Sequence, residues 1–485
     1  MNFTSAHWLG LLPILVLSAT IVVVMLAIAF RRHHRGNATC AVVGLNLALL
    51  ACVPLLAVPA TSITPLLIVD GYAAFYMGLI LVTTLATATL SHAYLEGYEG
   101  NKEEFYLLLL LAALGALVLV CSQHLAALFI GLELLSIPLY ALVAYPHKSR
   151  HALEAGLKYL VLSATASAFL LFGMALIYAQ TGTMAFAALS GFNDLAAQTG
   201  LGHAYLLTGG ALFLIGIAFK LSLVPFHLWT PDVYEGAPSP VTAFLATASK
   251  VAVFAVLLRY FEQGGGNHHP LLLDLLGVLA VLSILVGNLL ALRQNNVKRM
   301  LAYSSIAHFG YCLVGLIAAE QLAVEAVGMY LLTYVVTTLG AFGVVTLVSS
   351  PMQERDADAL YDYRGLFWRR PYLSSILTAM LLSLAGIPLT AGFIGKFYVI
   401  AAGVDARTWV LVGAVVVGSA VGLYYYLRLL ITLFMLDPDR RQRFEAPRDW
   451  AQQAGGAIVW GLMLLMLLIG IFPQPFIWLV QHAAL

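Results

Sequence analysis

The sequence contains little charge. Only 10% of its 485 residues are Asp, Glu, Lys or Arg, whereas a soluble domain carries about 25%. Because 61% of the residues are also hydrophobic, the composition excludes a chain that is surrounded mainly by water. It indicates that lipid is the solvent for most of the molecule, so the few charges become the residues to explain.

Cysteine is also scarce, and its pattern excludes several kinds of site. The four cysteines are scattered and form no CxxC pair: Cys40, Cys52, Cys121 and Cys312. That spacing argues against an iron–sulfur cluster, a zinc site or a disulfide framework. The glycines form neither a GxGxxG motif after a strand nor a P-loop. We therefore expect no metal, no redox cofactor and no nucleic acid to bind this chain.

Long hydrophobic runs are abundant, and a membrane-spanning helix needs about 20 mostly apolar residues. On this rule the sequence predicts an all-α polytopic membrane protein with about fourteen transmembrane helices. The predicted segments are Trp8–Phe30, Thr39–Val58, Tyr72–Ser91, Phe105–Cys121, Leu125–Tyr145, Leu157–Gln180, Tyr205–Val224, Pro240–Phe261, Leu271–Leu292, Leu301–Ala319, Val324–Val348, Tyr372–Ala401, Trp409–Phe434 and Ala454–Val480. The first run is too long for a signal-peptide core, so we expect it to be retained.

Basic residues are divided unequally between the two sides of this arrangement. If the side reached after the first helix is called the inside, its loops hold 17 of the 24 lysines and arginines. The opposite loops hold two, Arg259 and Arg407. Because basic loops face the cytoplasm, we expect both termini to lie outside, which for a bacterial inner membrane is the periplasm.

The stretch Ala218–Lys250 is predicted to contain a broken helix. Pro225 cannot donate a backbone hydrogen bond, and its ring clashes with the carbonyl group of Leu221. We therefore expect the seventh helix to break about one turn past Lys220. A bilayer tolerates such a break only inside packed protein or beside a wet cavity. The motif Gly386-Ile387-Pro388 predicts a second break in the twelfth helix.

Ionisable residues inside the predicted helices are the candidate site. A charge at the bilayer centre costs about 2.5–3.5 kcal/mol on insertion scales and marks ion or proton paths. The candidates for proton transfer are Glu133, Lys220, Lys250, His308 and Lys396, with Lys158 as a weaker member. A lysine ammonium donates hydrogen bonds and cannot coordinate a cation. The series therefore suits protons better than sodium ions.

Each candidate also has a structural explanation. Glu133 is compatible with a salt bridge or with a buried, protonated acid. Lys158 follows Glu154 by four residues, and such a pair at a helix start is compatible with surface packing. His308 is compatible with a hydrogen-bonded core residue.

Two spacings suggest an internal repeat. His308 follows Glu133 by 175 residues, and Lys396 follows Lys220 by 176. The predicted breaks also lie five helices apart, and an odd number of helices requires an inverted repeat, as in many transporters. We expect a three-helix segment at 1–100, a first five-helix repeat at 101–265, a second, inverted repeat at 266–436, and a loop with the last helix at 437–485.

Three segments resemble the antiporter-like membrane subunits of respiratory complex I, the NADH:quinone oxidoreductase. They are FKLSLVPFHLWTPDVYEGAPSPVTAFLATASK, NNVKRMLAYSSIAHFGY and LAGIPLTAGFIGKFYV. The form WTPDVYEGAPSPV and the lysine at 396 are similar to the N type rather than to the M and L types. The resemblance covers nearly the whole chain and implies a subunit that couples quinone reduction to proton pumping without a redox centre of its own.

The resemblance also implies roles and partners. Glu133 and Lys220 would form a coupled pair, Lys250 and His308 a central hydrated axis, and Lys396 the exit toward the outside. FMN, iron–sulfur clusters and the quinone site would lie on sister subunits of the membrane complex, and the chain would not form a homo-oligomer. A cation/proton antiporter subunit of the Mrp type, without redox coupling, is the alternative. A scaffold whose charges only lock helices together is a third possibility.

Overall fold

The structure is a computed structural model that describes residues 4–57, 60–191, 201–264, 270–318, 322–352, 355–436 and 450–483. Within these residues the chain is almost entirely helical, as predicted. Thirteen of the described helices are long and apolar enough to cross a membrane, one fewer than the fourteen predicted. The difference lies at the twelfth predicted segment, Tyr372–Ala401, where two shorter helices replace one long one.

The helices of the first half are α1 (Ser5–Phe30), α2 (His34–Cys52), α3 (Gly71–Leu95), α4 (Glu103–Val120), α5 (Leu125–Val143), α6 (Arg150–Thr181), α8 (Leu201–Leu221), α9 (Trp229–Gly236), α10 (Ser239–Phe244) and α11 (Lys250–Gln263). A π-helical turn at Leu245–Ser249 joins α10 to α11. Strands β1 (Thr61–Thr64) and β2 (Leu67–Val69) form an antiparallel hairpin before α3.

The helices of the second half are α12 (Pro270–Ala291), α13 (Val297–Ala318), α14 (Ala323–Val348), α15 (Leu366–Arg369), α16 (Pro371–Ala385), α17 (Ala391–Asp405), α18 (Trp409–Phe434), α19 (Trp450–Ile471) and α20 (Gln474–His482). The predicted segment boundary at 265/266 and the first part of the predicted C-terminal loop, 437–449, lie outside the described residues.

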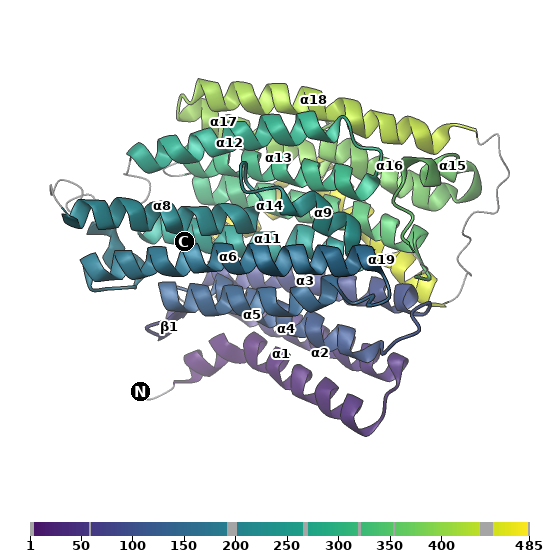
Figure 1. Cartoon of the computed structure of the whole chain (residues 1–485), viewed down its shortest axis with the longest axis horizontal. Helices are drawn as coiled ribbons and strands as arrows, with labels where there is room; N and C mark the ends of the chain where they lie inside the picture. Colours follow the sequence, from purple (N-terminus) through teal and green to yellow (C-terminus); the bar gives the residue numbers. More distant parts are fainter. Residues whose placement is uncertain are drawn as a thin grey trace.

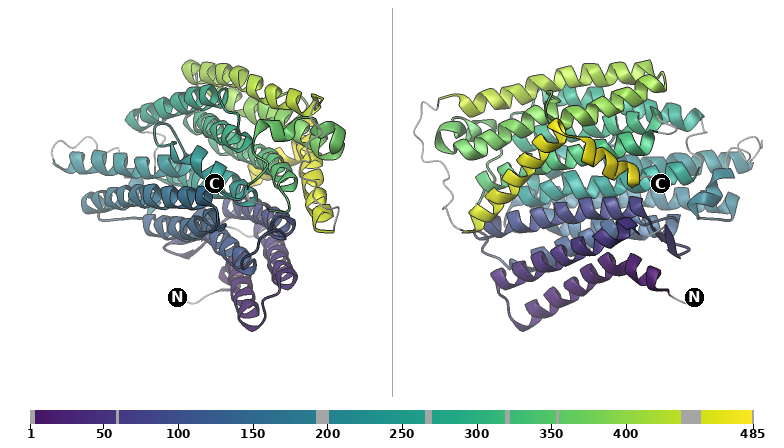
Figure 2. Two further views of the ribbon diagram at one scale, coloured as in Figure 1. Left: turned by 45° about the vertical axis from the view of Figure 1, so that its right-hand side comes forward. Right: turned by 180° about the vertical axis from the view of Figure 1, so that it is seen from behind.

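The long helices lie side by side in one bundle, with α1 and α2 at one edge and α18 at the other (Figure 1). Helix α19 crosses the back of the bundle obliquely, against α14 and α3 (Figure 2, right). The spans Ser239–Gln263, Val297–Ala318 and Ala323–Val348 are almost wholly buried, whereas α1 is mostly exposed. These three spans form the centre of the bundle and carry two of the candidate residues, Lys250 and His308.

The division between α16 and α17 follows from the residues at the junction. Gly386 has a φ of +87°, a left-handed conformation that glycine adopts without a steric penalty and that commonly ends helices. Pro388, two residues on, has no N–H to continue a helix. Each of the two helices has 15 residues, which is about 22 Å at 1.5 Å per residue. Neither is long enough to cross a hydrocarbon core of about 30 Å.

Helix α8 ends at Leu221, directly after Lys220 and thus earlier than predicted. Ser222 has a φ of +63°, so the chain leaves the helix before Pro225 is reached. Its connection to α9 is held by protein groups, because the N–H of Val224 donates a hydrogen bond of 2.9 Å to the Ser283 hydroxyl.

Arg259 lies inside α11, not in an outer loop as the sequence analysis predicted. Its side chain is fully buried, and its guanidinium donates two hydrogen bonds to the carboxylate of Asp70, at 2.7 and 2.8 Å. The same carboxylate caps α3 by accepting the N–H of Ala73 at 2.8 Å. A bidentate pair of this kind has fixed geometry, so it ties the start of α3 to the end of α11.

Candidate functional site

Lys220 occupies the last turn of α8 and points between α5 and α6. Its Nζ donates hydrogen bonds to the hydroxyls of Ser136 and Ser163, each at 2.7 Å. The Ser163 hydroxyl also accepts a hydrogen bond of 2.7 Å from the Tyr140 hydroxyl. The lysine is 7% exposed. These partners are neutral hydroxyls, which can accept a hydrogen bond from the ammonium and can donate one to the free amine.

Glu133 lies one turn before Ser136 on α5 and is half-buried. Its Oε1 accepts a hydrogen bond of 2.6 Å from Ser167, four residues after Ser163 on α6. Residues four apart share a helix face, so neighbouring hydroxyls of α6 hold Glu133 and Lys220. Among the described residues, the two side chains form no ion pair within 4.0 Å. The structure therefore brings the predicted pair together through serines rather than by direct contact.

Lys250 is the first residue of α11, after the π-helical turn. It is 1% exposed, and its Nζ donates a hydrogen bond of 2.9 Å to the Ser305 hydroxyl. Its Nζ also lies over the aromatic rings of Tyr234 and Phe309, 5.6 and 5.0 Å from the ring centroids. Single π-helical turns inside α-helices occur often at functional sites. Here the turn precedes the most deeply buried lysine of the series.

His308 lies three residues after Ser305 on α13 and is buried. Its Nδ1 shares a hydrogen bond of 2.7 Å with the Tyr330 hydroxyl. Four residues on in α14, the Tyr334 hydroxyl shares a hydrogen bond of 2.7 Å with Ser305. One face of α14 therefore contacts both the partner of Lys250 and the histidine, and the Tyr334 ring lies 5.4 Å from the His308 ring between centroids.

Lys396 folds back from α17 onto the end of α16. Its Nζ donates hydrogen bonds to the carbonyl oxygens of Leu384 and Ala385, at 3.0 and 2.9 Å. The last carbonyls of a helix have no partner within the helix, and a cation there also interacts favourably with the helix dipole. The carbonyl of Leu384, which a helix break sets free, is thus bound by the lysine itself.

A small cavity lies between His308 and the end of α16. Its lining includes Tyr330, Thr337, Ser383 and Leu384. Its volume is about 10 Å³, which is about the minimum for one water molecule. The cavity therefore adjoins both the histidine and Leu384, whose carbonyl binds Lys396.

Lys158 lies apart from this chain of groups. Its Nζ forms ion pairs of 2.8 Å with Glu154 and with Asp232, and its side chain is 42% exposed. Asp232 also pairs with Arg299 at 2.7 Å. Burial raises the pKa of Asp232, but the hydrogen bonds from Lys158 and Arg299 outweigh it and hold the pKa below its ordinary value. The structure thus places Lys158 in an ion-pair cluster near the N-terminal end of α6.

Sequence reasoning missed the hydroxyl groups that bind the candidates. Ser136, Ser163, Ser167 and Ser305 each contact a lysine or the glutamate. A usable signal exists, because the two serines of α6 are four residues apart in an otherwise apolar run. Glu133, Lys220 and Lys250 are thus hydrogen-bonded to serine hydroxyls, His308 to a tyrosine hydroxyl, and Lys396 to backbone carbonyls. Among the described residues, no group of three or more His, Cys, Asp or Glu side chains is arranged to hold a metal ion.

The chain is similar to known membrane proteins over nearly its whole length. Residues 122–422 match the family model described as NADH:quinone oxidoreductase/Mrp antiporter, TM. The chain is 59% identical to the NADH-quinone oxidoreductase subunit N of Ectopseudomonas mendocina, over 100% of this chain and 98% of the relative. It is also similar to a chain of respiratory complex I from Thermus thermophilus with bound aureothin, with 36% identity, a TM-score of 0.81 and coverage of 96% of this chain and 98% of that one.

A chain of the Mrp complex from Dietzia sp. has the same fold, with a TM-score of 0.85 over 99% of this chain and 97% of that one, but only 22% identity. The full-length identity to the N subunit, the matched model and the similarity to a complex I chain agree with the resemblance in the sequence. The chain belongs to the subunit N family of NADH-quinone oxidoreductase, the antiporter-like membrane subunits of respiratory complex I.

Proposed function

We propose that this chain moves protons across the membrane and couples that movement to quinone reduction elsewhere in the complex. The observation that carries the proposal is the burial of three lysines, Lys220, Lys250 and Lys396, which are 7%, 1% and 7% exposed. None of the three forms an ion pair within 4.0 Å among the described residues. An unpaired buried ammonium is expensive, and such groups in membranes commonly serve transport.

The first step uses the pair formed by Glu133 and Lys220. Burial favours the neutral amine, whereas a nearby carboxylate favours the ammonium. The serines that now separate the two side chains allow a small movement to bring them closer or farther apart. A charge change in a neighbouring subunit that moves Glu133 would therefore load or unload the lysine.

The later steps follow the hydroxyl groups through the centre of the bundle. The proton released by Lys220 reaches Lys250, passes along Ser305 and Tyr334 to His308, and leaves through Lys396. Three observations support the order. Hydrogen bonds join Lys250 to Ser305 and Ser305 to Tyr334, the Tyr334 ring contacts the His308 ring, and a cavity lies between the histidine and the end of α16. Lys158 is included as a weaker member, whose ion pairs with Glu154 and Asp232 hold its charge at the inner surface.

Several finer features belong to the same proposal. The seventh and twelfth spans act as broken helices, and the helices around them form two inverted five-helix repeats. The basic loops face the bacterial cytoplasm, and both termini face the periplasm. FMN, iron–sulfur clusters and quinone bind to partner subunits of the membrane complex, and the chain assembles with them rather than with copies of itself.

The test is Lys220→Ala in the assembled complex, with protons pumped per NADH oxidised as the readout. We expect pumping to fall at least tenfold, because alanine removes the titrating group. Arg32→Gln is the control, because its exposed ion pair with Glu104 lies away from the lysines. Full pumping at normal turnover in Lys220→Ala would overturn the proposal.

A cation/proton antiporter without redox coupling is the second candidate, because the Mrp chain shares the fold. Gentle purification separates the two. Flavin and iron–sulfur subunits that co-purify with the chain support the first function. Sodium-driven proton movement by the purified chain alone supports the second.

A further inference from the structure

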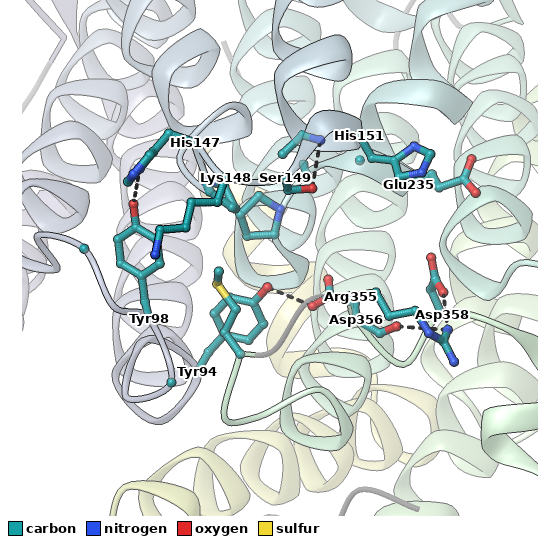
Figure 3. A pocket seen from close by; sticks show the side chains of 18 of the residues that line it. Tyr94, Tyr98, His147, Lys148, Ser149, His151, Glu235, Arg355, Asp356 and Asp358 are labelled. Carbon is teal, nitrogen blue, oxygen red and sulfur yellow. Dashed lines mark hydrogen bonds and ion pairs between the residues drawn. The ribbon is translucent and has the colours of Figure 1, made fainter.

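A large open cavity lies at the end of the bundle where the basic loops gather. Its volume is about 820 Å³, and its lining includes Tyr98, His147, Lys148, Glu235 and Arg355. The lining comes from the loops after α3 and α5, from the turn between α9 and α10, and from the segment after α14 (Figure 3). The cavity therefore presents charged and polar side chains among its lining, is wide enough for many water molecules, and opens on the side predicted to face inside.

The Asp356 carboxylate forms part of the cavity wall and joins three helix ends. Its Oδ2 accepts hydrogen bonds from the N–H and the hydroxyl of Ser239, at 3.0 and 2.6 Å, and forms an ion pair of 2.8 Å with Lys298. Its Oδ1 accepts a hydrogen bond of 2.8 Å from the Tyr94 hydroxyl, and Figure 3 shows the two side chains pointing toward each other. Lys298 is 1% exposed, and both residues of the pair line the cavity; we call the part of the lining that they form the cavity floor.

The helix that begins at Ser239 leads from the cavity floor to the central lysine. Lys250 is eleven residues farther along, which is about 16 Å at 1.5 Å per residue. Tyr234, next to the cavity residue Glu235, has its ring under Nζ of Lys250, 5.6 Å away. One aromatic side chain therefore contacts the lysine and adjoins the cavity lining.

Two buried hydroxyls lie on this route, those of Tyr234 and Thr338. Neither forms a hydrogen bond of 3.5 Å or less with another described residue, although Ser305 lies near the first and Tyr334 near the second. The Tyr234 ring packs against Phe342, with centroids 6.1 Å apart. Thr338 lies four residues before Phe342 on α14, and Tyr334 four residues before that. Residues four apart share a helix face, so Thr338 lies on the face of α14 whose Tyr334 shares a hydrogen bond with Ser305. The Tyr234 ring packs against the same face. Buried hydroxyls need partners, and water supplies them in proteins.

We propose that this cavity is the intake through which protons from the inner side reach Lys250, and that the ion pair of Asp356 with Lys298 is its gate. The inference rests on the proposed function and adds an entry route to it. A hydronium ion in the cavity gives up a proton, and an O–H bond forms on the carboxylate of Asp356. Neutralising that carboxylate removes the counter-charge of Lys298 and weakens the hold on Ser239.

The proton then travels along water and the hydroxyls of Tyr234 and Thr338. Each hydroxyl gives one proton forward and takes one from behind, and Asp356 loses its proton to the same chain. At the end an N–H bond forms on the neutral amine of Lys250. The carboxylate pairs again with Lys298, which closes the floor after the transfer.

Water access to Thr338 tests the route directly. We would label Thr338→Cys in the assembled complex with a small cationic methanethiosulfonate from the inner side and follow the mass of this subunit. Thr84→Cys is the matched control, because Thr84 is also buried and lies at a similar distance from the end of its helix. Thr84 is eleven residues before the end of α3, and Thr338 is ten residues before the end of α14. We expect Thr338→Cys to react at least tenfold faster, and Asp356→Asn to raise its rate at least threefold more.

Equal rates for Thr338→Cys and Thr84→Cys, with and without Asp356→Asn, would overturn the route. A fast reaction that Asp356→Asn leaves unchanged would overturn the gate. A second readout is proton pumping per NADH oxidised, which we expect Asp356→Asn to lower at least fivefold and Asp356→Glu to restore. If Asp356→Asn pumps normally while Lys220→Ala does not, the intake proposal fails and the proposed function stands.

Discussion

Lys250→Met tests whether the buried charge on α11 serves the fold or the transport of protons. In the structure the ammonium has one hydrogen bond, to Ser305, and two aromatic ring faces. A hydrogen bond to a charged group is worth about 1.5–3 kcal/mol and a cation–π contact about 1 kcal/mol. Burying the ion costs several kcal/mol. The two sums nearly cancel, so methionine, which has a similar volume, is expected to change stability by less than about 2 kcal/mol.

Arg259→Met is the matched control on the same helix. Arg259 is also buried, but it holds a bidentate ion pair with Asp70. Removing one partner of a buried pair costs about 3–5 kcal/mol, because the other charge is left uncompensated. We therefore expect Arg259→Met to reduce the amount of assembled complex strongly, and Lys250→Met to leave it nearly unchanged.

The assay combines the thermal midpoint of the purified complex with protons pumped per NADH oxidised in vesicles. We expect Lys250→Met to keep the midpoint of the unsubstituted complex and to lose pumping at least tenfold. The reasoning is refuted if Lys250→Met is destabilised as strongly as Arg259→Met while the complex that does assemble pumps normally. The lysine would then serve packing only.

Three further predictions follow from single contacts. Gly386→Ala strains a residue with a φ of +87° and places a Cβ 2.9 Å from Cδ of Lys396, so proton pumping is expected to fall although the lysine remains. Gly461→Ala is the control and should pump normally, because its Cβ meets nothing within 4 Å. Ser167→Ala removes a hydrogen bond to the carboxylate on α5, worth about 1.5–3 kcal/mol. Since 1.4 kcal/mol is about tenfold in an equilibrium, pumping in vesicles should fall about tenfold or more, and an unchanged rate would argue against the pair. The pKa of Asp232 is lowered in the folded chain, so its ion pairs stabilise the folded state at pH values above the unfolded pKa of about 3.9. This stabilisation is lost as the pH falls through the lower folded pKa. Thermal unfolding in detergent should show Asp232→Asn destabilised at pH 7 and progressively less so in acid, and a constant difference across pH would contradict this.

Several features were predictable because their causes are local in the sequence. Apolar runs of sufficient length identified the spans, and the combination of Gly386 and Pro388 identified the point where the twelfth segment divides into two helices. The buried lysines were also predictable, because a charge within such a run is itself the signal. The end of α8 was predicted less accurately, since the chain leaves the helix at Ser222 rather than at the proline.

Other features could not be predicted because they depend on contacts between distant segments. Arg259 was placed in an outer loop, but its partner Asp70 is 189 residues away and nothing local indicates the pairing. Lys298 lies between the ninth and tenth predicted segments, which the sequence analysis counted as an inner loop. In the structure it is buried and paired with Asp356, which is 58 residues away. Serines such as Ser163 are ordinary in membrane helices, and only the packing of α5, α6 and α8 shows that they bind the charged groups.

The most direct test of the central claim is a density map of the assembled complex at a resolution that shows ordered water. The account predicts one continuous file of hydrogen-bonded water and side chains from Glu133 and Lys220 through Lys250 and His308 to Lys396. Dry apolar packing that separates these side chains in every functional state of the complex would contradict it.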